Sequence, residues 1–526
     1  MAELVCAVDV GTKSARAGIF DRGGRLRGRG DHPILLHEPG GGRAEHSSDD
    51  IWRAVCAAVR SARRAADARA EDIAGLAFDA TCSLVVLDAA GRPLPVSASE
   101  EEGWDTISWM DHRALAEAAE CSALAHPVVA VAGGVMSPEM QAPKAMWLKR
   151  HRPDAWERTG LLLDLADFLA WRASGSTARS RCTLTAKWPY SAHEREGWQH
   201  DFLESVGLSD LLRRGGFSGA APVGADLGAL TPEAADALGL TPRCRVAAGM
   251  VDAFAGTLGV FAPQALAAGA EAGHAALIAG TSSCVMMMTK KPISLAGFWG
   301  PYAEIAVPGY WMTEGGQSAT GALLDHMVRM HAAGGEPTAG RHRAIAARVA
   351  ELRAREGEGF GAGLHVLPDF HGARAPLAAP AARGVISGLT LDASFDGLCR
   401  LYWRSCVSIA LGIRHILDTL AEAGPAIRTL HVTGGHTKNP LLMELYADAT
   451  GCTLVEPVAD EGVLLGTAMA AASGAGLFGD LAEACLAMRQ PTRERRPDAT
   501  GKARYDRDYR VFLEMQRQRS VLEGMG

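Results

Sequence analysis

Two short turns that combine glycine with hydroxyl side chains are the features of this chain best suited to bind phosphate. One turn holds Asp9, Gly11, Thr12, Lys13 and Ser14 after the apolar run 4–8, and the other holds Gly280, Thr281, Ser282 and Ser283 after the apolar run 276–279. Backbone N–H groups and small hydroxyls in such turns bind phosphate oxygens, and a carboxylate at a strand end, such as Asp9, can reach a metal ion on that phosphate. A glycine turn after a strand is also an ordinary hairpin element. One such turn in each half of the chain favours a nucleotide held between two lobes.

A third glycine segment lies near the C-terminal end. Residues 433–440 read Thr-Gly-Gly-His-Thr-Lys-Asn-Pro and separate a predicted strand from a predicted helix. Two adjacent glycines allow the backbone to approach a ligand closely, and the following helix N-terminus favours anions. A tight strand-to-helix turn is the alternative. Together with the two earlier turns, the segment favours ligand binding.

Asp252 is the candidate general base. It follows a short apolar strand and precedes a predicted helix, in the segment Gly249-Met-Val-Asp252. A carboxylate at a lobe junction can accept the proton of a substrate hydroxyl while that oxygen attacks the γ-phosphate. Aspartate before a helix is also a common helix cap, which is the structural alternative.

A sugar pocket requires several hydrogen-bonding groups together with an apolar wall. Four stretches supply these residue types: Asp79, Thr81, Cys82 and Ser83; Trp109, Met110, Asp111, His112 and Arg113; Lys187 and Trp188; and Glu314 and Gln317.

The elements that must position these residues alternate between strand and helix, which predicts α/β lobes. In the first half we expect a hairpin over 4–20, a helix over 51–68, strands over 73–78, 84–87 and 246–248, and helices over 138–150, 161–172 and 253–260. In the second half we expect strands over 275–279 and 430–433, and helices over 318–331, 395–423, 440–450 and 506–523. Residues 261–273 are the predicted crossing between lobes, and 334–342 and 490–500 are predicted loops.

Length and composition restrict the class of protein. A chain of 526 residues is too long for a single core and predicts two domains. The net charge of −7 and the absence of a Lys/Arg block argue against a nucleic-acid partner. The uncharged run 463–479 is rich in alanine and glycine, so we expect a closely packed helix rather than a membrane span. Eleven cysteines without a secretory signal indicate reduced thiols and a cytoplasmic location.

The phosphate turns, residues 249–255 and residues 433–440, in this order, resemble the motifs of the FGGY carbohydrate kinases. The resemblance extends from about residue 4 to 475. Within that family, residues 78–88, 109–114 and 433–440 resemble most closely the D-ribulokinase-like pentulose kinases.

The resemblance implies an α/β fold of two ribonuclease-H-like (actin-like ATPase) domains, residues 1–262 for sugar and 263–526 for ATP, with the active site in the cleft between the lobes. Asp252 is then the general base, Asp9 the Mg²⁺-side carboxylate, and Asp79, Thr81, Cys82, Asp111, Lys187 and Glu314 sugar contacts. The implied ATP contacts are Thr12, Lys13, Ser14, Gly280, Thr281, Gly321, Gly434, Gly435 and Asn439. Two positions depart from the family pattern, since His436 replaces a third glycine and Phe254 stands where many relatives have histidine.

The resulting expectation is an enzyme that transfers the γ-phosphoryl group of ATP to the terminal hydroxyl of a ketopentose, most simply D-ribulose. L-ribulose, xylulose and ribitol remain open as acceptors. A nucleotide-driven interaction protein of the actin type and a non-catalytic sugar sensor are the alternatives from other classes. Nicotinamide chemistry and Walker-type NTP binding lack their glycine motifs here. The tail helix, with Phe512, Met515 and Leu522 on one face, is expected to pack internally or in a homodimer.

Overall fold

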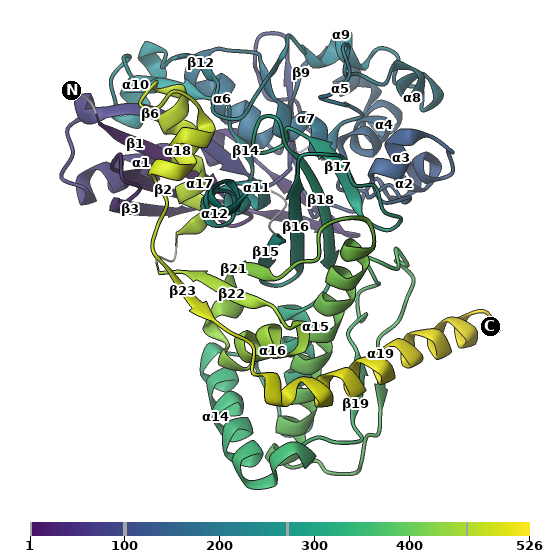
Figure 1. Cartoon of the computed structure of the whole chain (residues 1–526). Coiled ribbons are helices and arrows are strands. Elements are labelled where there is room, and N and C mark those ends of the chain that lie inside the picture. The colour runs from purple at the N-terminus through teal and green to yellow at the C-terminus, as the bar shows by residue number, and fades with distance from the viewer. Residues whose placement is uncertain (1–2, 98–102, 270–272, 459–460, 526) are drawn as a thin grey trace.

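The computed structural model describes residues 3–97, 103–269, 273–458 and 461–525, and these form two lobes, each built on a mixed β-sheet (Figure 1). In the described residues, the N-terminal sheet has strand order β12-β13-β6-β1-β2-β3, with β14 also paired to β6. The C-terminal sheet has the order β17-β18-β16-β15-β21-β22-β23. The two-lobed α/β prediction is confirmed.

The N-terminal lobe contains the following strands and helices. Its main sheet consists of β1 (Leu4–Val10), β2 (Ser14–Phe20), β3 (Leu26–Pro33), β6 (Ile73–Ala80), β12 (Asp226–Ala229), β13 (Arg245–Ala247) and β14 (Met250–Val251). A second sheet is formed by β4 (His37–Gly40), β5 (Arg43–His46), β7 (Leu84–Asp88), β8 (Thr106–Ile107) and β9 (Thr159–Asp164). Its helices include α1 (Ser48–Ala65), α2 (Leu115–Ser122), α3 (Pro127–Val131), α4 (Gln141–His151), α6 (Leu165–Ser174), α7 (Arg181–Lys187), α10 (Pro232–Leu238), α11 (Asp252–Val260) and α12 (Ala262–Ala268).

The C-terminal lobe repeats this plan. Its main strands are β15 (His274–Ala279), β16 (Ser283–Thr289), β17 (Trp299–Ala303), β18 (Trp311–Gln317), β21 (Thr429–Thr433), β22 (Thr453–Pro457) and β23 (Thr492–Arg495). Its helices are α13 (Gly321–Met330), α14 (Ala339–Glu356), α15 (Phe395–Ala423), α16 (Pro440–Thr450) and α19 (Lys502–Glu523). Two further helices, α17 (Gly462–Gly474) and α18 (Leu481–Ala487), come after β22 in sequence but pack on the N-terminal lobe.

Parallel strand pairing fixes where the candidate residues lie. Strand β6 pairs in parallel with β1, with Asp79 opposite Asp9, and in parallel with β14, with Asp79 opposite Met250. Asp252 follows β14 directly, so the register brings three aspartates to one edge of the sheet. In the other lobe, β15 pairs in parallel with β21, with Ile278 opposite Thr433. The turns that begin at Gly280 and Gly434 therefore leave the same edge of that sheet.

Two glycine-rich helices join the lobes. Helix α17 packs against α11 and against β1 and β6 of the N-terminal sheet, although in sequence it lies between β22 and β23 of the C-terminal sheet. A methyl group on Gly259 would collide with the carbonyl oxygen of Gly462, and one on Gly466 would collide with that of Ala255. The uncharged run is therefore a closely packed helix, as predicted. One apolar core contains residues of both sheets, among them Val5 and Ala276. The domain boundary after residue 262 stays a prediction.

Several predicted element boundaries differ from the structure. Residues 161–164 form strand rather than helix, because they pair with β7 in the second sheet, and α6 begins only at Leu165. Helix α14 begins at Ala339, inside a predicted loop, where the Thr338 hydroxyl caps it. Strand β23 lies in the other predicted loop and is exposed along its length. The predicted lobe crossing contains helix α12, and residues 270–272 of it lie outside the described residues.

The predicted tail helix exists as α19, which crosses the C-terminal lobe and leads to the C-terminus (Figure 1). Phe512 is buried and Met515 packs on the core, whereas the Leu522 side chain is 68% exposed. The predicted apolar face therefore ends before Leu522. No helix of the described residues is long and apolar enough to cross a membrane. All eleven cysteines are free thiols.

Two glycines of α11 provide a test of the α11–α17 contact. Gly259→Ala should lower the free energy of unfolding by about 1–3 kcal/mol, because the added methyl group overpacks the helix contact. Gly256→Ala, in the same helix, is the control, since its methyl group would lie 3.5 Å from Val463 at ordinary contact distance. Denaturant unfolding monitored by circular dichroism measures both, and equal stability of the two variants would contradict the packing described.

Candidate active site

A cavity of about 290 Å³ lies between the lobes at the sheet edges where the glycine turns begin. Residues of both lobes line it, including Gly11 and Thr12 of the first turn and Ser282 of the second. Of the predicted site residues, it brings together Thr12, Thr81, Cys82, Lys187, Asp252 and Glu314. Turns 270 residues apart in sequence thus border one small chamber.

Asp252 lies at the first position of α11 and borders this cavity. Its Oδ1 accepts a hydrogen bond of 2.7 Å from the backbone N–H of Ala253, which fixes the carboxylate at the helix N-terminus. Burial raises the pKa of Asp252, and the N–H of Ala253 and the positive charges of Lys187 and Arg16 partly oppose that shift. The group is a positioned proton acceptor whose affinity for a proton exceeds that of an exposed aspartate.

Asp9 and Asp79 form a buried acidic pair beside Asp252. Arg16 Nη2 lies 2.5 Å from Asp9 Oδ2, but neither carboxylate oxygen of Asp9 has a partner in hydrogen-bond geometry within the described residues. Burial raises the pKa of Asp9 to about 6, against the opposing effect of Arg16. Asp79 accepts a hydrogen bond of 2.5 Å from the Thr467 hydroxyl, and burial together with Asp9 raises its pKa well above the usual range. Asp79 lies opposite Asp9 on the neighbouring strand, and neither of them is among the residues that line the cavity.

Buried carboxylate oxygens without a well-aligned hydrogen bond suit a divalent cation. Hard cations such as Mg²⁺ prefer oxygen ligands, and Mg²⁺ is usually bound by one or two carboxylates together with substrate phosphates. The Asp9 oxygens fit that donor set. Within the described residues no group of three or more His, Cys, Asp or Glu side chains could hold a metal by itself, which is consistent with a cation that binds with its phosphate.

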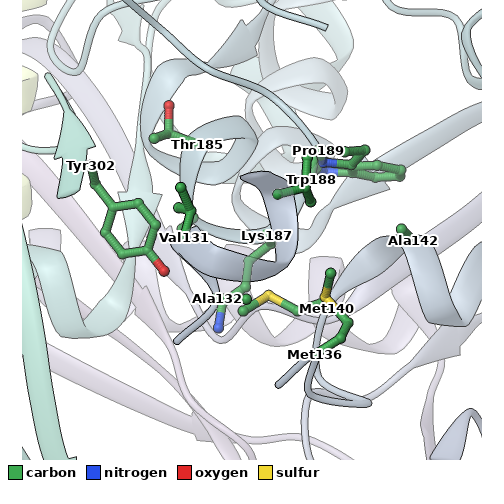
Figure 2. Close-up of a pocket in the computed structure, with 12 residues that line it drawn as sticks. Val131, Ala132, Met136, Met140, Ala142, Thr185, Lys187, Trp188, Pro189 and Tyr302 are labelled. Carbon is green, nitrogen blue, oxygen red and sulfur yellow. The ribbon is translucent and has the colours of Figure 1, made fainter. Parts of the chain in front are cut away.

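Lys187 and Glu314 provide opposite charges on the cavity wall. Burial opposes the charge of Lys187, but the surrounding Cys82, Glu139, Tyr302 and Glu314 outweigh it and raise the pKa of the amine. Burial raises the pKa of Glu314, partly offset by Lys187. Figure 2 shows the Lys187 side chain with Tyr302, Met136 and Met140 around a second, smaller cavity of about 30 Å³. Lys187 is therefore a fixed cation on a largely apolar backing.

The predicted nucleotide residues divide into turn positions and helix caps. Gly434 has φ of +96°, and a side chain on it would meet the Ala279 carbonyl oxygen, whereas the space around Gly435 is open. Gly321 donates from its backbone N–H to the Gly280 carbonyl oxygen at 3.0 Å. The Asn439 side chain caps α16, accepting from the N–H groups of Leu441 and Leu442.

The remaining predicted phosphate residues surround the two turns. Thr12 accepts a hydrogen bond of 3.0 Å from Trp109 Nε1. Lys13 is exposed, and the carbonyl oxygen of Ser14 accepts from Gly11 N–H at 3.1 Å. Thr281 lies on a larger groove of about 890 Å³, which shares Trp109, Glu139, Ser282, Trp299 and Arg374 with the small cavity. The space between the lobes is thus a small chamber that opens into a wide groove.

Comparison with known proteins assigns the family. Residues 4–259 match the model of the FGGY family of carbohydrate kinases, N-terminal domain, and residues 275–475 match the model of its C-terminal domain. The chain belongs to the FGGY family of carbohydrate kinases. It is therefore a phosphotransferase, as its resemblance to the family implied.

Relatives of this FGGY kinase cover nearly all of its chain. A Homo sapiens protein named FGGY carbohydrate kinase domain-containing protein is 42% identical and covers 97% of this chain and 95% of its own. A Saccharomyces cerevisiae protein named D-ribulokinase YDR109C is 34% identical and covers 91% of this chain and 72% of its own. The crystal structure of xylulose kinase from Rhodospirillum rubrum has the same fold, with a TM-score of 0.80 at 23% identity over 99% of both chains.

Asp111 does not line the cavity of the FGGY kinase. Its carboxylate accepts from the Ala44 N–H and from Arg113, which also donates to Glu45, in an ion-pair cluster whose side chains are almost fully buried. The cluster holds the loop that carries Trp109, and Trp109 borders the cavity. The structure places Asp111 in support of the loop rather than at the cavity wall.

The cavity residues of the kinase that were not predicted from sequence include Glu139, Trp299, Tyr302 and Arg374. Glu139 was assigned to the predicted helix 138–150, whereas α4 begins only at Gln141. Arg374 lies in a long irregular segment between β19 and β20. The only sequence signal for the aromatic pair was the stretch Trp299-Gly-Pro-Tyr302, which resembles any edge strand. These residues join the site through tertiary contacts alone.

The acidic pair predicts a pH-dependent stability of the kinase. Folding raises the pKa of Asp9 from an ordinary ~3.9 to about 6, so the ionised carboxylate destabilises the folded state. This loss of stability is absent below pH ~3.9 and complete above pH ~6. Asp9→Asn removes it. The unfolding free energy of the variant relative to wild type should therefore rise by on the order of 2 kcal/mol between pH 4 and pH 7 in the presence of EDTA.

Denaturant titrations at several pH values measure this difference. The exposed substitution Asp236→Asn, in α10, is the matched control. A difference between Asp9→Asn and wild type that stays constant across this pH range would contradict the role of the buried charge.

Proposed function

We propose that this FGGY kinase transfers the γ-phosphoryl group of ATP to the terminal hydroxyl of an open-chain ketopentose, and that D-ribulose is converted to D-ribulose 5-phosphate. The observation that carries the proposal is the position of Asp252, a half-buried carboxylate on a cavity bordered by both glycine turns. Similarity to the protein named D-ribulokinase supports the choice of acceptor. The cavity volume of about 290 Å³ lies just below the ~300–1,000 Å³ range of ligand pockets, which supports a small acceptor such as a pentose.

In the proposed reaction, Asp252 accepts the proton of the attacking hydroxyl as the new O–P bond forms and the β–γ bridging bond breaks. Its raised pKa brings the carboxylate nearer to the pH at which it works, which favours proton transfer. Thr81, Cys82, Lys187 and Glu314 line the same cavity and would hold the sugar oxygens. Asp79 and Asp111 would act through their neighbours, by supporting Asp9 and the Trp109 loop.

ATP would bind across the two turns. Thr12, Lys13 and Ser14 on one side and Gly280 and Thr281 on the other would surround the phosphates, and Gly321, Gly434 and Gly435 would border the adenosine. Asn439 would contribute by capping α16, whose N-terminus follows the Gly434 turn. Mg²⁺ held near Asp9 would neutralise phosphate charge as the phosphoryl group transfers. Lobe closure would exclude the water that competes for that group. Eleven free thiols support a cytoplasmic location.

A panel of acceptors tests the function directly. Purified protein with Mg–ATP should release ADP fastest with D-ribulose, more slowly with L-ribulose, xylulose and ribitol, and at a low background rate without sugar. Coupled ADP detection gives the rates, and mass spectrometry identifies the phosphorylated product. A preference for another pentulose or a pentitol would replace the proposed acceptor. ADP release that no sugar stimulates would favour an actin-type ATPase.

Asp252→Asn tests the base. The substitution preserves size and the hydrogen bond from Ala253, but the amide cannot accept the proton, so kcat should fall by about 10²–10⁴. In the wild type, kcat/KM should decline as pH falls through the raised pKa of Asp252, because the protonated carboxyl is inactive. A kcat within tenfold of wild type would rule out the general-base role.

A further inference from the structure

Glu139, Lys187, Trp299 and Arg374 form a charged group on the wall of the sugar cavity, and we name it the cavity clamp. Glu139 and Lys187 belong to the N-terminal lobe, whereas Trp299 and Arg374 belong to the C-terminal lobe. Lys187 Nζ lies 3.9 Å from Glu139 Oε2, and Arg374 Nη2 lies 3.6 Å from Glu139 Oε1. Both cations also lie over the Trp299 ring, 5.2 and 5.5 Å from its centroid. The Glu139 carboxylate and the Trp299 indole therefore both contact Lys187 and Arg374, two cations from opposite lobes.

The hydrogen-bonding capacity of these cations is unused. Both ion-pair distances exceed the usual range of N–H···O bonds. Neither the Lys187 amine nor the Arg374 guanidinium has a hydrogen-bond partner among the residues the structure describes, although both border the cavity. The Lys187 side chain is 8% exposed, whereas that of Arg374 is 31% exposed, and the planar guanidinium fork of Arg374 is suited to bind two neighbouring oxygens. The available donors point to a ligand that carries oxygen acceptors.

Arg374 remains charged in this setting. Burial opposes its charge, but the surrounding Cys284, Glu139, Glu314 and Cys82 outweigh burial and raise its pKa. A second pair of charges also connects the lobes, since Arg181 of α7 forms a hydrogen-bonded ion pair with Glu304. Neither Arg181 nor Glu304 lines the cavity. The contact between Arg374 and Glu139 thus differs from a simple lobe-to-lobe ion pair.

We propose that Arg374 is a substrate-binding residue that reads two neighbouring oxygens of the acceptor sugar, and that Glu139 orients it for this task. This assignment rests on the proposed function and deepens it. Asp252 and Lys187 contact the acceptor from the N-terminal lobe, and Arg374 contacts it from the C-terminal lobe. The site is complete only when both lobes hold one open-chain molecule with oxygens on adjacent carbons, such as a pentulose.

Steady-state kinetics of the full chain with D-ribulose and Mg–ATP test the assignment. Arg374→Gln should raise KM for the sugar at least tenfold and leave KM for ATP within twofold of wild type. Arg374→Lys keeps the charge but loses the fork, so its KM for the sugar should lie between those of Gln and wild type. Arg181→Gln is the matched control, because it removes an ion pair between the lobes outside the cavity, and its KM for the sugar should stay within twofold.

Glu139→Gln adds a second readout. If Glu139 acts by orienting Arg374, the double variant Glu139→Gln/Arg374→Gln should be no worse than Arg374→Gln alone. Circular dichroism confirms that each variant is folded. An Arg374→Gln variant with a sugar KM within twofold of wild type would overturn the assignment and leave the proposed function intact, as would equal effects of Arg374→Gln and Arg181→Gln. A wild-type protein that phosphorylates no sugar of the panel would instead overturn the proposed function, and the assignment with it.

Discussion

The burial of three aspartates at one sheet edge is the constraint on which the rest of the site depends. Parallel pairing of β6 with β1 and β14 places Asp9, Asp79 and Asp252 at one buried sheet edge. Arg16 and the Thr467 hydroxyl offset only part of that negative charge, and burial raises all three pKa values. Burial disfavours the ionised forms of these carboxyls, and a cation bound beside them would relieve that cost.

The close contact between helices α11 and α17 supports the buried aspartates. Helices α11 and α17 approach so closely that Gly259 and Gly466 cannot carry a side chain without displacing backbone. Asp252 begins α11, and Thr467 of α17 hydrogen-bonds Asp79, so the same helix pair positions two of the three carboxylates. The cavity walls contributed by the C-terminal lobe are different in kind. Arg374 comes from an irregular segment, and its contact with Glu139 is loose, which suits a group that must tighten on a substrate.

Positively charged and acidic side chains line the same small cavity. Lys187 and Arg374 keep their protons, whereas burial makes the carboxyls of Asp252 and Glu314 harder to ionise. A neutral polyhydroxyl acceptor can donate to the carboxylates and accept from the cations at once. Water would satisfy the same groups, so a closure of the lobes that excluded it would have an electrostatic as well as a steric role.

The sequence by itself determined the elements with strong local signals. The hairpin 4–20, the helices 395–423 and 440–450, and the two glycine turns follow from periodicity and turn chemistry, and the family follows from the order of the motifs. The tertiary structure alone decided the rest. Residues 161–164 form a strand because they pair with β7. Asp111 forms a buried ion pair because its carboxylate contacts Arg113 and accepts a hydrogen bond from the Ala44 N–H. Glu139 and Arg374 reach the cavity through contacts between segments 235 residues apart. Local patterns reflect interactions between near neighbours in sequence, whereas the shape and charge of a cavity depend on contacts between distant residues, which the fold creates.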